Sequence, residues 1–592
     1  MADKSDDKPS VAEGRKAFAR CKDAENHNRI EALEDTRFAK LGEQWPDEVK
    51  KQREAQKRPC LTINKMPTFI RQVVNDARQN KPSIKVRGVD SHSDPKTADV
   101  MNGLIRNIEY ASNADVAYDT AIESAVVGGV GYIRIGMDYT FDDSFDMDIT
   151  IERVLNPFAV YGDPNSTAAD SSDWDQAFIV DKMPKEDFKR KYKGKTDTDF
   201  DSDAWQNAGD DWVQENTVQI AEWWTRTEED REIVQLSDGR IFSKEDIEQD
   251  QDVMIGIETN SIQIVGERVT KSHKVRQVIM SGADVLEDNE WPGRYIPIVP
   301  VYGDEFSVEG KRYFRSLINP SKDAQRMFNY WRTIGTETVA LAPKVPWIGR
   351  KGTFDSDAAR WDTANAESHS YLEYDGEVPV RPPLDVGPAA GAMQESLNAS
   401  DDIKAIIGMY DASLGARSNE TSGKAIMARQ REGDVSTFHF IDNLSRAIRH
   451  TGKIIIDLIP HVYNKARIIR VMGEDKKEKT VQINQEFQEI NEETGEPLVD
   501  QNQEVVMALH DLTVGKYDLT VEAGPSFTTR REEAASQMTE LVRAFPQAAP
   551  YIADIMAKNF DWPGADEIAK RFEQMNPAKQ KQIPPEVQQQ IE

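Results

Sequence analysis

Two predicted helices of nearly equal length stand on either side of 45 residues that are rich in proline, glycine and aromatic side chains. The first starts at Asn319-Pro320, a good N-cap followed by a first-turn proline, and ends before Ala342-Pro343. The second covers 387–407, so the two helices would be roughly 33 and 32 Å long. Strands are predicted between them at 345–348 and 370–374. The pattern predicts an antiparallel stalk with a β knob at its tip, although two ordinary core helices with an irregular connection fit it equally well.

The rest of the chain alternates between helical and extended regions, which predicts an α+β protein. At 592 residues it is long enough for three to five structural units. One helix is expected over 11–58, another over Pro95–Gly128, and a very long one over 424–463, with further helix over 526–575. Strands and loops dominate 149–310. Tyr295–Tyr302 alternates aliphatic residues with prolines, which is typical of an edge strand or an extended connector.

The charge balance of the chain is strongly negative and unevenly spread. There are 103 acidic and 74 basic residues, a net charge of −29. Three segments, 138–215, 228–258 and 474–511, carry nearly all of the excess, whereas 342–352 holds three bases and no acid. This balance argues against a protein that wraps DNA by neutralising phosphates, but it does not exclude one that touches DNA without holding it. Each acidic segment fits either a solvated face or a surface that repels something negative.

The cysteine content and the hydropathy pattern also restrict the cellular compartment and the kinds of structural cross-link that the protein can have. Only Cys21 and Cys60 are present, which excludes a disulfide framework and a cysteine-based zinc site and fits a reducing compartment. The chain contains no run of 18 apolar residues, so no membrane span is predicted. The N-terminus has no apolar segment typical of a secretory signal.

Catalytic and ligand-binding motifs fail when their spacing is examined. The run 415–425 approaches a phosphate-binding loop but has Ser418 and Ala425 where Gly and Ser or Thr are required. The alternating aspartates of 197–203 lack the glycine and the closing glutamate of a calcium loop, which favours a solvated acidic loop. His439, His450 and His461 recur every 11 residues, a separation of roughly 16 Å on a helix and too long for one metal ion. We therefore expect no enzyme activity, no cofactor and no metal site.

Ten short segments, in this order, resemble the portal proteins of tailed bacteriophages, most closely the long portals of short-tailed phages. They are Gly42–Pro46, Arg58–Asn64, Asn75–Asn80, Val218–Trp223, Tyr295–Gly303, Lys322–Arg326, Asn419–Gly423, Arg429–Gly433, Phe440–Leu444 and Gly524–Phe527. None of them carries catalytic chemistry. Each is weak alone, but their order and their span over most of the chain are specific.

The resemblance implies a multi-domain portal fold that assembles into a ring, usually of twelve copies, at one vertex of the capsid. Such a ring nucleates capsid assembly and lets double-stranded DNA pass without sequence specificity during packaging and ejection. Its implied partners are further copies of the chain, the terminase large subunit, major capsid and scaffolding proteins and tail adaptor proteins, with no membrane. The implied location is the portal vertex of the virion, after synthesis in the cytoplasm of the bacterial host.

The resemblance also divides the chain into parts. It implies an α/β wing at 1–318 and 408–525, a two-helix stem at 319–341 and 387–407, a small α/β clip at 342–386, and a helical crown at 526–592. Within the clip, the candidates for binding a partner protein are Lys344, Arg350 and Lys351. The segment that matches the DNA-facing tunnel loop is Asn419, Glu420, Thr421, Ser422, Gly423 and Lys424, although a lysine at that place could equally begin a helix and pair with nearby acids.

Two other functional classes stay open on the residues alone. An acidic hydrolase carried by the virion would need an isolated carboxylate pair in a cleft. A scaffold or adaptor that binds a motor without enclosing DNA would form an assembly with no pore of roughly 20 Å, the scale of a duplex.

Overall fold

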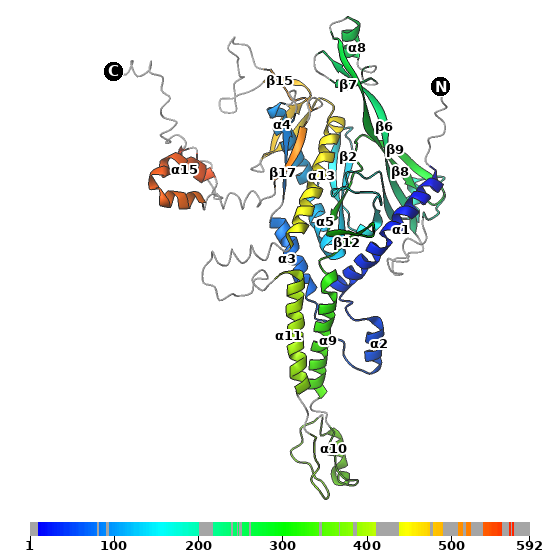
Figure 1. Cartoon of the computed structure of the whole chain (residues 1–592), viewed down its shortest axis with the longest axis vertical. Coiled ribbons are helices and arrows are strands. Elements are labelled where there is room, and N and C mark those ends of the chain that lie inside the picture. The colour runs from blue at the N-terminus through cyan, green and yellow to red at the C-terminus, as the bar shows by residue number, and fades with distance from the viewer. Residues whose placement is uncertain are drawn as a thin grey trace.

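The protein is an elongated molecule with an α/β body, a two-helix arm and a small tip at the far end of the arm (Figure 1). The computed structural model describes residues 10–79, 82–89, 94–200, 217–237, 241–244, 247, 251–259, 262–341, 346–365, 367–382, 387–409, 437–473, 478–488, 507–512, 517–522, 537–558, 568–569 and 571–572. The described residues combine helices with antiparallel strands, which confirms the α+β class.

The first part of the chain is broken into several helices rather than the single one expected over 11–58. Helix α1 (Val11–Thr36) begins with a capping box between Ser10 and Glu13. It continues into the π-helical turn η1 (Arg37–Leu41), which ends at Gly42 with a φ of 72°, and α2 (Asp47–Ala55) starts only after Pro46. The left-handed glycine and the proline stop the helix despite the continuous charged pattern. Helix α3 (Met66–Gln79) follows.

The helix expected over Pro95–Gly128 is also two helices. Helix α4 (Pro95–Ala111) and α5 (Ala114–Gly128) meet at Asn113, whose φ of 50° is left-handed. Asparagine tolerates this conformation better than most residues, so a corner forms while the apolar spacing continues. Both helices bury one face in the main core.

Two antiparallel sheets form most of the body. The smaller one has the order β10-β2-β3, from β2 (Val130–Tyr139), β3 (Met147–Arg153) and β10 (Ile298–Tyr302). Strand β10 lies at its edge and includes Pro300, as expected for an edge strand. The larger sheet has the order β4-β5-β6-β8-β9, with β7 paired to β6. Its strands are β4 (Val160–Tyr161), β5 (Gln176–Pro184), β6 (Thr217–Leu236), β7 (Ile241–Ser243), β8 (Ile264–Met280) and β9 (Val285–Trp291).

Four two-stranded sheets complete the strand inventory of the described residues. They pair β1 (Ser83–Gly88) with β17 (Tyr517–Glu522), β11 (Asp304–Val308) with β12 (Lys311–Arg315), β13 (Arg467–Met472) with β14 (Glu478–Ile483), and β15 (Glu486–Gln488) with β16 (Met507–Leu509). The pairing of β1 with β17 joins segments more than 400 residues apart in the chain. Segments that precede the arm in the sequence therefore pair with segments that follow it, and both belong to one body.

Helix α13 (Phe438–Val462) crosses the body and packs into the main core with α5 and β10. It accounts for most of the long helix expected over 424–463; the part before residue 437 lies outside the described residues. Two short helices belong to the larger sheet, α6 (Lys185–Lys191) after β5 and α8 (Gln251–Glu258) near the end of the β6–β8 ribbon. Near the C-terminus, η9 (Pro546–Ala548) and α15 (Ala549–Lys558) are helical.

The arm consists of α9 (Lys322–Leu341) and α11 (Gly387–Ile407), which lie side by side (Figure 1). This is the stalk arrangement rather than a pair of core helices. Asn319 does not cap α9, because it lies in a preceding 3₁₀ turn, η5 (Asn319–Ser321).

The tip of the arm differs from the β knob that was predicted. It contains η7 (Asp355–Asp357) and α10 (Ala358–Thr363), and its one described β pairing is the bridge between Ile348 and Val380. Residues 370–374 form no strand, so that prediction was wrong.

Candidate functional surfaces

The arm exposes apolar side chains on both of its helices. On α9 the exposed apolar residues are Met327, Tyr330 and Val339, and on α11 they are Met393, Leu397 and Ile406. Other residues of the two helices are buried, among them Phe328 on α9 and Ala392, Ala399 and Ile403 on α11. A helix with apolar residues outside its buried face has more apolar surface than its own chain covers, which is typical of a surface that packs against another protein.

One side of α9 is covered by an extended segment from the N-terminal part, residues 59–65, which we call the strap. The α9 side chains that face it recur every four residues: Gln325, Asn329, Thr333 and Glu337. The first three are buried. They bind strap backbone, with Leu61 N donating to Thr333 Oγ1 at 3.2 Å and Ile63 N donating to Asn329 Oδ1 at 3.0 Å. Backbone groups that would otherwise be unsatisfied are thus paired by the helix.

Two arginines that precede the strap, Arg53 and Arg58, bind Glu337 of α9. Arg53 Nη2 lies 3.0 Å from one carboxylate oxygen of Glu337, and Arg58 Nε lies 2.6 Å from the other. Hydrogen bonding from Arg58, together with that from Arg53, holds the pKa of the Glu337 carboxyl below its usual value. The carboxylate therefore stays ionised, and α9 is fastened to the segment around α2 over four successive helical turns.

The base of α9 is anchored to the end of α1 by a buried ion pair. Lys322 Nζ lies 2.8 Å from Asp35 Oδ1, and the Asp35 side chain is only 2% exposed. Asp35 also accepts hydrogen bonds from Ser316 Oγ and Asn319 Nδ2. The neighbouring Glu34 pairs with Lys322 at 3.4 Å but is half exposed. The arm is thereby fixed to the body where it begins.

The tip of the arm has a small aromatic core. Trp361 packs edge-on against Trp347 and Phe354, and its indole N–H donates to Glu373 O at 2.6 Å. The guanidinium of Arg381 lies over the Trp347 ring. Edge-on packing of aromatic side chains therefore holds together a segment with little regular secondary structure.

Of the three basic residues proposed for partner binding at the tip, two lie in the described part of the chain. Arg350 is exposed and pairs with the exposed Glu377 at 3.2 Å, and Lys351 is exposed beside it. Lys344 lies outside the described residues. An exposed pair of this kind contributes little to stability, so these charges are available to another molecule.

The segment proposed to face DNA, Asn419 to Lys424, also lies outside the described residues. So do the rest of the run 415–425 and Asp201 and Asp203 of the acidic loop. The chain leaves the arm at Met409 and is described again from Thr437, at the start of α13. No group of three or more His, Cys, Asp or Glu side chains suited to a metal ion occurs among the residues described.

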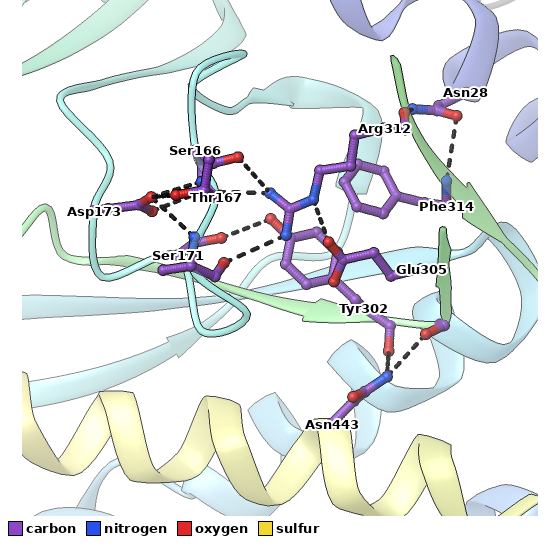
Figure 2. Close-up of polar contacts among 12 residues, drawn as sticks. Asn28, Ser166, Thr167, Ser171, Asp173, Tyr302, Glu305, Arg312, Phe314 and Asn443 are labelled. Atoms are coloured by element: carbon purple, nitrogen blue, oxygen red, sulfur yellow. Dashed lines mark hydrogen bonds and ion pairs between the residues drawn. The ribbon is translucent and has the colours of Figure 1, made fainter. Parts of the chain in front are cut away.

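A polar junction joins the loop 162–175 to the strands β10, β11 and β12 (Figure 2). At its centre, Arg312 pairs with Glu305 at 2.5 Å and donates to Ser166 Oγ at 3.3 Å. Its guanidinium also lies over the rings of Tyr302 and Phe314, at 4.6 and 5.1 Å from their centroids. One arginine therefore contacts three separate segments of the body.

Asp173 holds the loop side of this junction. It accepts hydrogen bonds from Thr167 N at 2.6 Å, Ala168 N at 2.9 Å and Ser166 Oγ at 2.7 Å. Burial alone would raise the pKa of the Asp173 carboxyl, but these hydrogen bonds outweigh it and hold the pKa below its usual value. This aspartate is thus a structural acceptor that holds the loop in place.

Helices α1 and α13 join the same junction from opposite directions. Asn28 Nδ2 donates to Arg312 O at 2.9 Å, and Asn443 Nδ2 donates to Gly303 O at 2.8 Å (Figure 2). Contacts of the junction therefore connect α1 and α13 with strands and loops of the two sheets. Sequence reasoning missed both the junction and the strap, because their contacts join residues that are far apart in the chain.

The histidines of α13 have separate surroundings. His450 is buried edge-on against Tyr295, and burial lowers its pKa to about 4. His439, about three turns away, lies beside Asp304 at the start of the helix. Neither arrangement suggests a shared metal ion. In the described part of the chain, no helix has both the length and the apolar character needed to cross a bilayer.

Comparison with known proteins shows a match to a family model and similarity to a curated protein. The family model for "Phage P22-like portal protein" matches residues 15–592. A protein named "Portal protein", from Acyrthosiphon pisum secondary endosymbiont phage 1, is 25% identical over 585 residues, which cover 93% of this chain and 78% of that protein.

Proposed function

Because the chain belongs to the P22-like portal protein family, we propose that it forms a ring, of twelve copies, at one vertex of the capsid. The ring nucleates capsid assembly and serves as the passive conduit for double-stranded DNA in packaging and ejection. Its partners are the terminase large subunit and then tail adaptor proteins, together with major capsid and scaffolding proteins. It is a structural component of the virion and has no catalytic role.

The exposed apolar surface of the arm is the observation that best supports this proposal. Its two helices bury one face against each other and leave Met393, Leu397 and Tyr330 exposed. Burial of such residues is worth about 1.5–3 kcal/mol per side chain. Neighbouring copies arranged head to tail around a closed ring would cover them on every copy.

We assign the parts of the chain accordingly. The arm helices, 319–341 and 387–407, form the stem, and 342–386 form the clip that meets terminase and then the tail. Residues 1–318 and 408–525 form the wing, and 526–592 the crown. Two sets of contacts support this division: the junction around Arg312 joins separate segments of the wing, and the anchor at Asp35 joins the stem to it.

Purified protein tests the ring directly. Twelve chains of 66.9 kDa give a particle of about 800 kDa in light scattering. Negative-stain images should show rings with a central channel wide enough for a duplex, roughly 20 Å or more. A chain that stays monomeric at every salt concentration would contradict the proposal, and a closed assembly without a pore would favour the scaffold or adaptor alternative.

The basic residues of the clip give a second test. Reversing two charges in Arg350→Glu/Lys351→Glu should weaken terminase or tail docking about tenfold or more while rings still form, because the side chains are exposed and hold no structure together. Docking is measured by co-sedimentation with each partner. The matched control, Glu377→Lys, removes the same ion pair while adding positive charge, and it should leave docking intact. Unchanged docking by the double variant would remove these residues from the interface.

Lys424 gives a third test, within the proposed DNA-facing segment. In Lys424→Glu, a negative charge placed at the channel wall should slow packaging, which is measured as DNA protected inside capsids over time. The control Lys424→Gln separates loss of the positive charge from gain of a negative one. Packaging at the wild-type rate by Lys424→Glu would instead identify Lys424 as a helix-start lysine that pairs with nearby acids.

A further inference from the structure

The loop between β2 and β3 presents two aromatic side chains to solvent. Phe141 is 67% and Phe145 is 92% exposed. The loop is nevertheless well held, since Thr140 N donates to Asp146 O at 2.9 Å and Ser144 N donates to Phe141 O at 3.0 Å. Asp146 N also donates to Ser144 Oγ at 3.0 Å. A closed turn thus keeps both rings away from their own chain, and exposed aromatic pairs of this kind are typical of contact sites.

The loop that carries these two rings is rich in acidic residues. Five aspartates lie on the loop and the adjoining strand ends: Asp138, Asp142, Asp143, Asp146 and Asp148. Arg467 pairs with Asp148 at 3.3 Å and lies 3.9 Å from Asp146. Among the described residues, neither Asp142 nor Asp143 takes part in an ion pair. A surface that receives this loop should therefore combine an apolar hollow with positive charge.

A hollow with that chemistry lies where β5, β6 and α6 meet. It has a volume of about 570 Å³ and is lined by apolar side chains, by three basic residues and by two aspartates: Met183, Pro184, Ile220, Lys182, Arg190, Lys191, Asp181 and Asp187. The segment 182–195 around it carries seven bases and two acids, although the larger region 138–215 is strongly acidic. Arg190 pairs with Asp187 at 2.7 Å and Lys191 with Glu287 at 3.0 Å, so part of this positive charge is already balanced.

We propose that the loop 140–146 of one copy inserts Phe141 and Phe145 into the hollow beside α6 of the next copy. A second copy is the inferred partner, since Phe145 is almost fully exposed in its own chain and the proposed ring brings copies side by side. A ring built head to tail needs two different complementary surfaces on every copy, and an acidic aromatic loop facing a hollow lined by apolar and basic side chains supplies such a pair. This inference rests on the proposed ring and adds a contact in the wing to those of the stem.

Site-specific cross-linking between two differently tagged chains tests the contact. Both chains carry Cys60→Ser, which removes the partly exposed cysteine, while the buried Cys21 stays. One chain carries Phe145→Cys and the other Met183→Cys, and the two are assembled together and oxidised. A disulfide requires Cα atoms within about 7 Å, so a mixed dimer carrying both tags is expected only if the loop meets the hollow. The control pairs Met183→Cys with Tyr110→Cys, which is 63% exposed at the end of α4, and should give no mixed dimer.

The outcomes separate this contact from the ring itself. Rings that form but give no mixed dimer overturn the contact and leave the ring proposal standing. Failure of the Cys60→Ser parent chain to form rings, while the unmodified chain also fails, contradicts the ring proposal instead.

A charge-exchange series tests the same contact without cysteines. Asp142→Lys/Asp143→Lys and Arg190→Glu/Lys191→Glu should each raise the protein concentration needed for half-maximal ring assembly about tenfold, because like charges then meet. Combining all four substitutions in one chain should recover most of that loss. Additive loss in the combined variant would overturn the pairing, and thermal unfolding of each monomer shows whether the fold is intact.

Discussion

Replacing Met393 and Leu397 by glutamate should abolish ring assembly and leave a folded monomer. Both side chains are more than half exposed on α11, at 58% and 52%, and the arm does not bury them itself. In the proposed ring each copy places them against the next, where two uncompensated carboxylates would cost several kcal/mol per contact. Because a closed ring repeats every contact around its circumference, this cost recurs at each interface. Light scattering should therefore report particles near the mass of one chain.

A matched control separates the position from the added charge. Gln394→Glu/Asn398→Glu adds the same two charges with the same spacing, one residue further along α11 and about 100° around the helix. Both of these polar residues are already exposed. The control should assemble like the wild-type chain. Loss of rings by both variants would mean that net charge decides assembly, and loss by neither would exclude this stripe of α11 from the contact.

The helices of the arm could be predicted because their signals are local. Pro320 and Pro343 mark the two ends of the first helix, and the length of the second periodic stretch gives the extent of the other. The structure has α9 over Lys322–Leu341 and α11 over Gly387–Ile407. The α+β class could likewise be predicted, because helical and extended patterns occupy separate stretches of the chain.

The break between α4 and α5 and the conformation of the tip could not be predicted from local signals. Apolar spacing continues across Asn113, so periodicity alone gives one helix where the left-handed asparagine makes two. At the tip, β propensity predicts a strand over 370–374, but aromatic packing around Trp361 determines the conformation instead. Side-chain packing of this kind overrides local propensity.

The strap and the polar junction depend on contacts across the chain. Ile63 and Asn329 are separated by 266 residues, and Arg312 on β12 reaches Ser166 of the loop 162–175 across 146 residues of the chain. The one local sign of the strap was the polar residue at every fourth position of α9, which a solvent-exposed face would explain equally well. The proposed DNA-facing residues, Asn419 to Lys424, remain a prediction from resemblance.

Removing the carboxylate of Asp35 should loosen the base of the arm. In Asp35→Ala, Lys322 would lose its buried partner at 2.8 Å, and Ser316 Oγ would lose its acceptor. Breaking a buried pair by deleting one partner costs about 3–5 kcal/mol, because the remaining charge stays buried without compensation. The neighbouring Glu34→Ala removes a half-exposed carboxylate from the same lysine and should cost less than about 1 kcal/mol. Amide hydrogen exchange over 316–326 measures the difference locally, without assuming two-state unfolding of a multi-domain chain. Faster exchange in Asp35→Ala than in Glu34→Ala is expected, and equal rates would show that the buried pair does not anchor α9.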